Sequence, residues 1–474
     1  MALSSKPRSV RQPSVRRSLG FLASGTVFAQ GIQFAASLIL TRLYTPAEFG
    51  QYASILAIAS VLGAVITMSY QTAIPLAEDD EESRVVAWLT LATSAMAAAF
   101  ITVAFTALVA AGVQILGWQP DWQHVLFVPL TALSIATWGT LQYRQARLGA
   151  FHRVAVATGS GAATQVGSQI GLGLLGSGAP GLSAGYLTGR VVNTLFLSRG
   201  ARIGRPPGLH RLRQVGARWS QMPKWQLPTV VLNMLATTAL TPWVAHVYGL
   251  SEAGSFAFAL QMLSVPVALV GQAFATILFP RLAEADREEG IPPASVEQYV
   301  KGLASVAFPA FLPVLILGPQ LFALVFGSEW TQAGQIAALL TPYLALTLVT
   351  SPISSIPVVK RRLCKILLWA AIDTAARFAA ISLGATLGSA GTGILLYSAV
   401  GTISTALYLA WILRLSQVRV RAMLGANSGA WVLAAGSATA LLFLRHAASL
   451  PVLLVLTVSM CCAWTLLAIR GLRR

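Results

Sequence analysis

Three charged side chains lie inside apolar stretches of this sequence, where a charge is costly unless it is paired or used. Arg190 lies in the stretch GYLTGRVVNTLF without an acidic neighbour, and Tyr186 and Asn193 fall on the same helical face. A guanidinium binds phosphate oxygens through paired hydrogen bonds. We therefore expect Arg190 and Asn193 to contact an anionic cargo.

The other two charges form a pair on a single stretch. Asp373 precedes Arg377 by four residues, the acid-first order that favours an ion pair along a helix. The pair has two interpretations: a self-neutralising structural bridge, or a functional pair in which Arg377 binds cargo and Asp373 couples transport to an ion. The sequence leaves both open.

Two further stretches carry hydroxyl and amide side chains at helical spacing. Polar stripes of this kind either line a cavity or hydrogen-bond to neighbouring helices. We expect Gln30, Gln33, Asn233 and Thr237 to face a cavity, where a polar ligand or water would meet them. The stripes comprise Thr26, Gln30, Gln33, Ser37 and Thr41 in one stretch, and Gln226, Thr229, Asn233, Thr237 and Thr241 in the other.

Residues that catalyse a reaction or hold a metal do not gather into a motif in this sequence. It contains no phosphate-binding glycine loop, and Cys364, Cys461 and Cys462 have no histidine or carboxylate at metal-ligand spacing. We therefore expect a protein that is not an enzyme, with no catalytic residues, no metal and no cofactor.

The apolar stretches that contain these residues indicate a protein embedded in a lipid bilayer. Of its 474 residues, 55% are hydrophobic and only 10% are charged, which is too much apolar surface for a water-soluble fold. Apolar runs of about 20 residues, enough to cross a bilayer as a helix, recur along the chain. The sequence predicts an all-α polytopic membrane protein with about 14 transmembrane helices, over 19–41, 50–75, 85–113, 124–143, 154–175, 179–198, 225–247, 253–279, 301–326, 332–356, 366–386, 389–413, 427–444 and 450–469.

The positive charge is distributed as in membrane loops. The net charge of +18 would favour a nucleic-acid partner if it lay on one soluble domain. Instead, nearly all of the 33 lysines and arginines fall on one side of the predicted membrane, with Arg42 and Arg445 on the other. The positive-inside rule then places both termini in the cytoplasm of a bacterium. We expect an inner-membrane protein without a nucleic-acid partner.

An internal repeat divides the predicted spans. The segment RLYTPAEFGQYA at 42–53 and the segment HVYGLSEAGSFA at 246–257 share Tyr, Glu, Gly and Ala at matching positions. Six spans separate the two copies, so both halves enter the membrane in the same direction. We expect Glu48 and Glu252 to cap helix amino termini.

The predicted divisions are a basic tail at 1–18, an N-lobe at 19–198, a basic cytoplasmic linker at 199–224, a C-lobe at 225–413, and two extra helices with a basic tail at 414–474.

Two inner loops are strongly charged. The linker contains LHRLRQVGARW, in which Leu209, Leu212, Val215 and Trp219 form one apolar edge of a short helix. We expect this helix to anchor to anionic lipid. The acidic segment EDDEES at 78–83 is expected to be a solvated turn, with exchange of salt bridges with basic loops as the alternative.

The two repeat segments, together with FGSEWTQAG between the spans 301–326 and 332–356, resemble the polysaccharide-transport branch of the multidrug, oligosaccharidyl-lipid and polysaccharide exporter superfamily. This branch includes Wzx-type O-antigen flippases. The resemblance implies two parallel six-helix lobes in a V-shaped arrangement around a cavity that opens alternately to each side. It also implies an undecaprenyl-pyrophosphate-linked oligosaccharide as cargo, an ion gradient as driving force, and membrane lipids, a glycan polymerase and chain-length machinery as partners.

Two other functions compete with this interpretation. A multidrug or cation antiporter of the same superfamily would favour an acidic or aromatic site, whereas this cavity is predicted to be cationic. A membrane-embedded polysaccharide polymerase or ligase would need a sizeable outer loop with catalytic side chains, and the predicted outer loops are short.

Overall fold

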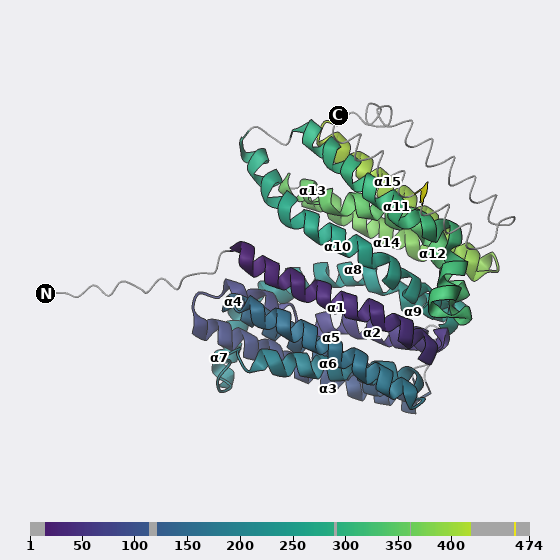
Figure 1. The fold of residues 1–474 in the computed structure, drawn as a ribbon. Helices are drawn as coiled ribbons and strands as arrows, with labels where there is room; N and C mark the ends of the chain where they lie inside the picture. The colour runs from purple at the N-terminus through teal and green to yellow at the C-terminus, as the bar shows by residue number, and fades with distance from the viewer. Residues whose placement is uncertain (1–14, 113–120, 289–291, 361, 419–458, 461–474) are drawn as a thin grey trace. The chain divides into compact units, whose positions relative to one another are not determined.

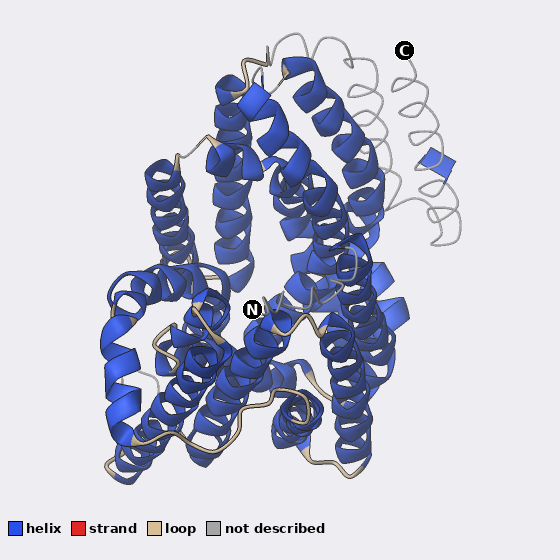
Figure 2. Ribbon diagram, turned by 90° about the vertical axis from the view of Figure 1, so that its left-hand side faces the viewer, coloured by secondary structure: helices blue, strands red, loops and turns tan. Residues whose placement is uncertain are grey.

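The computed structural model describes residues 15–112, 121–288, 292–360, 362–418 and 459–460. The described residues form helices and connecting turns and contain no strand (Figures 1 and 2). Seven of the described helices are long and apolar enough to cross a bilayer, and the bent pair α8 and α9 makes an eighth. The all-α polytopic class is therefore confirmed. The expected spans 427–444 and 450–469 fall almost entirely outside the described residues, as does most of the tail 1–18.

The chain divides into two compact units. The first comprises the described residues up to Leu40 together with Ile55–Met234, and the second comprises Thr41–Ser54 together with the described residues from Leu235 onward. The linker expected at 199–224 thus folds with the first unit. The first unit holds most or all of α1 (Val15–Leu43), α2 (Pro46–Ile66), α3 (Asp80–Ala110), α4 (Trp122–Arg147), α5 (Phe151–Leu174), α6 (Gly178–Ser198), α7 (Leu209–Arg218) and α8 (Leu227–Thr238).

Within the first unit, α5 packs along α6, and α4 packs against both α3 and α6. Within the second unit, α12 packs against α10, α11 and α15, and α14 packs against α15. Each unit therefore has a central helix, α4 or α12, that contacts several others. The second unit holds α9 (Leu240–Tyr248), α10 (Leu250–Glu288), α11 (Pro293–Phe326), the 3₁₀ turn η3 (Ser328–Trp330), α12 (Thr331–Ile353), α13 (Ser355–Val359), α14 (Leu363–Thr386) and α15 (Ala390–Leu415).

Two expected spans differ from the helices in the structure. The span expected over 50–75 ends at Ile66, because Met68 and Ser69 adopt left-handed backbone angles with φ of 48° and 58°, and a 3₁₀ helix, η1 (Tyr70–Leu76), follows. The span expected over 225–247 is preceded by a π-helical turn, η2 (Met222–Gln226), and bends by 46° between α8 and α9. Pro242 explains the bend, since its ring clashes with the carbonyl of Thr238 and supplies no N–H to it.

The two copies of the internal repeat meet inside the second unit. The backbones of α2 and α10 cross where Gly50 faces Gly254. A methyl group on Gly50 would overlap the carbonyl oxygen of Leu250, and one on Gly254 would overlap the carbonyl oxygen of Pro46. The contact is reciprocal, because Pro46 and Leu250 are themselves matching positions of the repeat. This equivalence in space supports the duplication inferred from the sequence.

The expected cap at the first copy is present. The backbone N–H of Thr45 donates to Glu48 Oε2 at 2.8 Å, and the backbone N–H of Glu48 donates to Thr45 Oγ1 at 3.3 Å. These reciprocal bonds satisfy two donors at the start of α2. Glu48 is therefore engaged in capping, as predicted.

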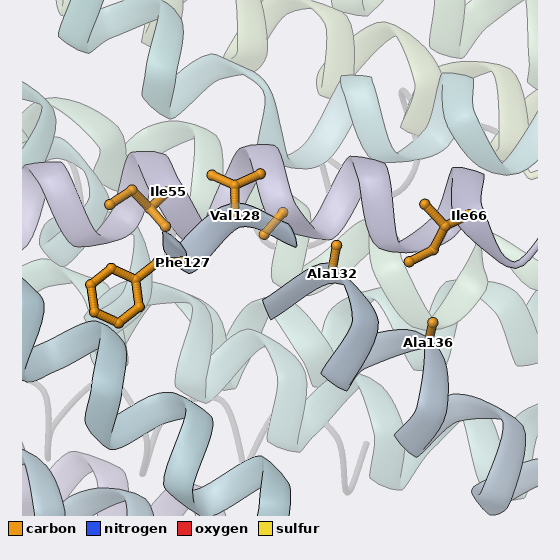
Figure 3. Packing of buried hydrophobic residues seen from close by; sticks show 7 residues of the cluster. Ile55, Ile66, Phe127, Val128, Ala132 and Ala136 are labelled. Atoms are coloured by element: carbon orange, nitrogen blue, oxygen red, sulfur yellow. The ribbon is translucent and has the colours of Figure 1, made fainter. Parts of the chain in front are cut away.

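The core of the first unit is built from branched side chains of α2 and small side chains of α4. Ile55 and Ile66 pack with Phe127, Val128, Ala132 and Ala136 (Figure 3). The alanines lie one helical turn apart, so they form a shallow face that the isoleucines fill. This contact fixes α4, which carries one side of the candidate site described next.

Candidate functional site

Arg190 lies between two aromatic rings in the first unit. Its Cζ is 4.4 Å from the centroid of the Trp138 ring and 4.9 Å from that of Tyr186. Its Nε donates a hydrogen bond to Tyr186 Oη at 2.9 Å. A guanidinium over an aromatic face is attracted by the ring quadrupole. We call Trp138, Tyr186 and Arg190 the N-lobe cage.

The local sequence and the helix packing explain this arrangement. Tyr186 precedes Arg190 by four residues on α6, so the two side chains share one helical face. Trp138 comes from α4, which packs against α6. Its ring rests on the cluster formed by Leu141, Val154, Ala157, Leu197 and Ala201. Tyr186 was visible in the sequence as a neighbour of Arg190, whereas Trp138 was not predicted.

Asn193 lies in a different setting from the one expected. It is buried against Gly161 of α5, where a methyl group on the glycine would meet the Asn193 side chain at 3.0 Å. Gly185 and Gly189 of α6 likewise make room for Gln169 and Gln165. The small residues of α5 and α6 thus serve close helix packing. The structure brings Arg190 together with Tyr186 and places Asn193 at the contact between α5 and α6.

Arg377 occupies a second aromatic cage, in the second unit. Its Cζ lies 4.2 Å from the centroid of the Tyr343 ring and 5.2 Å from that of Tyr397. Its Nε donates to Asp373 Oδ2 at 2.8 Å, and its Nη1 donates to Tyr397 Oη at 3.1 Å. Arg377 is only 6% exposed, so the pair predicted from the sequence is present and largely buried. We call Arg377, Asp373, Tyr343 and Tyr397 the C-lobe cage.

The two cages use helices that the internal repeat makes equivalent. Trp138 and Tyr343 lie on the fourth expected span of each half, α4 and α12, while Tyr186 and Tyr397 lie on the sixth, α6 and α15. The arginines differ, because Arg190 is on the sixth span and Arg377 on the fifth. They also differ in charge balance: Asp373 pairs with Arg377, whereas Arg190 pairs with no carboxylate in the described part of the chain.

The polar stripes lie on α1 and α8. Gln30 and Gln33 on α1 are half-buried, and Gln30 Oε1 is inaccessible and without a partner among the described residues. Asn233 and Thr237 on α8 are both exposed, as are Gln226 and Thr229 on the same stripe. Amide and hydroxyl groups are unfavourable against lipid tails. The exposed stripe therefore fits a surface that meets water or a polar cargo.

The acidic segment at 78–83 forms salt bridges with the linker helix. Arg218 of α7 pairs with Glu78 and, at 3.2 Å, with Glu82. The hydrogen bond to Glu78 raises the pKa of Arg218 above its ordinary value. Arg211 pairs with Glu81 at 3.3 Å. The segment thus forms salt bridges with a basic loop, the partners named in the alternative expectation, while Glu78 and Glu81 remain exposed to solvent.

The apolar edge expected on α7 is present, but it contacts protein. Val215 is buried with residues of η1 and α3, and Leu212 and Trp219 pack against the same cluster. Leu209 remains 64% exposed. Lipid anchoring by the whole apolar edge is thus replaced by docking onto the first unit, because three of its four side chains are used there.

A further arginine, not singled out in the sequence, fastens the same region. Arg147 at the end of α4 donates to the backbone carbonyls of Ile74, Pro75, Ala77 and Asp79 at 2.8–3.1 Å. These carbonyls belong to η1 and the turn after it, and that of Asp79 also accepts the N–H of Ser83 in the first turn of α3. Arg147 therefore holds in place the segment that precedes α3.

A metal site does not emerge from the described residues, since none of them form a group of three or more His, Cys, Asp or Glu side chains suited to an ion. The charged groups of the two cages are two guanidiniums and one carboxylate.

Comparison with known proteins gives one family match. Residues 39–335 match the model of a family described as polysaccharide biosynthesis protein. The succinoglycan biosynthesis transport protein ExoT of Rhizobium meliloti is 25% identical over 390 residues, which cover 80% of this chain and 76% of ExoT. The lipopolysaccharide biosynthesis protein WzxC of Escherichia coli is 26% identical over 178 residues, 38% of this chain and 36% of WzxC. The latter alignment thus spans about a third of each chain.

Solved structures with a similar fold are membrane transporters. The lipid II flippase MurJ in an inward closed conformation aligns with a TM-score of 0.72 at 12% identity, covering 96% of this chain and 99% of MurJ. An inward-facing multidrug resistance transporter of the MATE family aligns with a TM-score of 0.52 at 16% identity, covering 85% of this chain and 95% of the transporter. At these identities the similarity concerns the fold.

Proposed function

Because the chain belongs to the polysaccharide biosynthesis protein family that its residues 39–335 match, we propose that it is a flippase for a lipid-linked surface-polysaccharide precursor. The cargo is an oligosaccharide carried on undecaprenyl pyrophosphate, moved by alternating access across the bacterial inner membrane. The names of ExoT and WzxC, which refer to the biosynthesis of surface glycans, support a carbohydrate cargo. A membrane-embedded polymerase or ligase receives no such support.

The main support for this proposal is the unneutralised charge of Arg190 in the N-lobe cage. Arg190 is a half-buried guanidinium on α6, where the sequence predicts a span over 179–198, and no carboxylate in the described chain neutralises it. Such a charge is expensive in a membrane unless it faces water or a ligand of opposite charge. A pyrophosphate supplies that opposite charge and the oxygen geometry that a guanidinium prefers.

The polar stripes fit the remainder of the cargo. Glycan hydroxyls cannot pass through hydrocarbon unaided, whereas a polyprenyl tail can remain in lipid. Gln30, Gln33, Asn233 and Thr237 offer amide and hydroxyl groups of the kind that hydrogen-bond to sugars. Asn193 contributes indirectly, by fixing α6 against α5.

Ion coupling is assigned to the C-lobe cage. Asp373 Oδ2 accepts from Arg377, whereas Asp373 Oδ1 is inaccessible and has no partner among the described residues. A proton or a cation on Asp373 would weaken its hold on Arg377 and let Arg377 bind cargo phosphate. The pair thereby links an ion to the cargo.

Orientation and partners follow from the same proposal. The basic loops place both termini in the cytoplasm, so the cargo enters from the side where its glycan is assembled. A glycan polymerase and chain-length machinery would then receive it on the other side. A multidrug or cation antiporter is disfavoured, because two arginines and one aspartate give the caged charges a positive balance.

A deletion strain tests the function directly. We expect the lipid-linked oligosaccharide to accumulate on the cytoplasmic face, measured by its accessibility to a glycosidase that cannot cross the membrane. Arg190→Ala and Arg377→Ala should each fail to restore export while inserting normally. Arg213→Ala, at an exposed position of α7, is the matched control and should restore export. An unchanged sidedness in the deletion strain would refute the flippase.

A further inference from the structure

The N-lobe cage leaves part of its arginine unused. Arg190 Nε is engaged by Tyr186 Oη, while the two terminal amino groups form no hydrogen bond with any residue in the described ranges. The hydrogen bond at Nε and the rings of Trp138 and Tyr186 thus hold the guanidinium group. The N–H donors of its two terminal amino groups remain available. A planar pair of donors is the arrangement that captures two oxygens at once.

The C-lobe cage shows which kind of group this chain places against an arginine that lies near two aromatic rings. There Arg377, near the rings of Tyr343 and Tyr397, donates from Nε to the carboxylate of Asp373 at 2.8 Å. In the N-lobe cage Tyr186 takes the Nε donor, so an oxyanion would meet the terminal amino groups of Arg190 instead. An oxyanion is therefore the group that this protein itself places against a caged arginine. The N-lobe cage has repeat-equivalent aromatic helices but lacks the internal oxyanion.

Trp138 is the element of the N-lobe cage that comes from another helix. Its ring packs against the cluster around Leu141 and Leu197, which residues of α4, α5 and α6 form together, so the packing of these three helices fixes its orientation. Its Nε1 is inaccessible and has no partner among the described residues. The face of the ring that meets Arg190, rather than its polar edge, is therefore the part that makes a specific interaction.

We infer that Trp138 is a positioning residue for the anionic group of the cargo, holding the Arg190 guanidinium so that its terminal amino groups bind two oxygens of a diphosphate. This inference rests on the proposed function and adds specificity to it. A diphosphate carries more negative charge and more oxygens than a monophosphate, so it gains more from a planar donor pair that is held in one orientation. A guanidinium free to rotate would lose more of its affinity for the diphosphate than for the monophosphate.

Binding of short polyprenyl phosphates to the purified full chain in lipid nanodiscs tests the inference. The probes are farnesyl diphosphate, farnesyl monophosphate and inorganic pyrophosphate, which separates a lipid-borne from a free phosphate source. The variants are Trp138→Leu, Trp138→Phe, Tyr186→Phe, Arg190→Lys and Arg190→Ala. Trp122→Phe is the control, because Trp122 begins the same helix and is 59% exposed.

Trp138→Leu should weaken farnesyl diphosphate binding about threefold to thirtyfold, the range expected for loss of a cation–π contact. The affinity for farnesyl monophosphate should change much less. The ratio of diphosphate affinity to monophosphate affinity should therefore fall toward the ratio measured for Arg190→Lys. Trp138→Phe keeps an aromatic ring in the packed site, so its ratio of diphosphate to monophosphate affinity should be close to that of the unmodified chain. This variant also serves as a control in case Trp138→Leu does not fold. Trp122→Phe should bind like the unmodified chain.

The outcomes separate this inference from the proposed function. If Arg190→Ala abolishes diphosphate binding but Trp138→Leu and Trp138→Phe retain the wild-type affinity ratio, Trp138 does not position Arg190. If Trp138→Leu lowers affinity for both phosphates equally, its role is only structural and the inference is overturned. If Arg190→Ala binds every probe normally, the anion site itself is wrong and the proposed cargo contact fails with it.

Discussion

Replacing Gly50 or Gly254 by alanine would drive a methyl group into a backbone carbonyl of the opposing helix, Leu250 in one case and Pro46 in the other. A backbone carbonyl cannot rotate away as a flexible side chain does, so α2 and α10 must separate. Separation would also strain the aromatic packing of Phe49 against Phe258 at 5.5 Å between ring centroids. Overpacking of this kind costs about 1–3 kcal/mol, and we expect the upper half of that range.

The two substitutions should cost nearly the same, because the contact is reciprocal. A loss of about 2–3 kcal/mol corresponds to a fall in melting temperature of about 4–12 °C for a unit of some 200 residues, measured by thermal unfolding in one detergent. Gly302→Ala is the matched control: Gly302 lies within α11, and a methyl group added to it would meet no atom within 4 Å. It should be neutral or slightly stabilising. Unfolding of Gly50→Ala and Gly254→Ala at the wild-type temperature would refute the crossing.

Three other substitutions test the part of the first unit around η1 and α7 by the same assay. Arg147→Met removes four hydrogen bonds to backbone carbonyls and should cost about 2–4 kcal/mol, whereas the exposed Arg213→Met should cost nothing measurable. Trp219→Ala removes a half-buried ring from the cluster under α7 and should cost about 2 kcal/mol. Arg218→Gln removes the ion pairs of a half-exposed arginine to the exposed Glu78 and the buried Glu82 and should lower the melting temperature less than Trp219→Ala does. Equal effects of Trp219→Ala and Arg218→Gln would mean that charge, not packing, holds α7.

Local spacing predicted what lies on one helix, and it missed what a second helix supplies. The Asp373–Arg377 bridge and the capping by Glu48 follow from separations of four and three residues, and both are present. Trp138, in contrast, reaches Arg190 from α4, more than fifty positions earlier in the chain. Only the packing of α4 on α6 brings them together, and a single sequence contains no signal for that contact.

The same limit explains the linker helix and the bent span. The apolar edge of α7 was evident from its periodicity, but periodicity does not distinguish lipid from protein as the partner. For the acidic segment, salt bridges with basic loops were one of two expectations, and the sequence did not indicate that α7 supplies the partners. The bend between α8 and α9 could have been predicted from the sequence, since Pro242 lies within the expected span.

Assignment of Thr41–Ser54 to the second unit has a consequence for gene architecture. A duplication usually yields halves that stand alone, and such halves can be separated into two genes or exchanged between relatives. Here the chain passes between the units near Leu40, Ser54 and Met234, so a cut in the 199–224 linker would send 41–54 away with the wrong half. The second unit would lose Gly50 as the partner of Gly254. A cut at that linker would therefore put the two glycines of this helix crossing on separate chains.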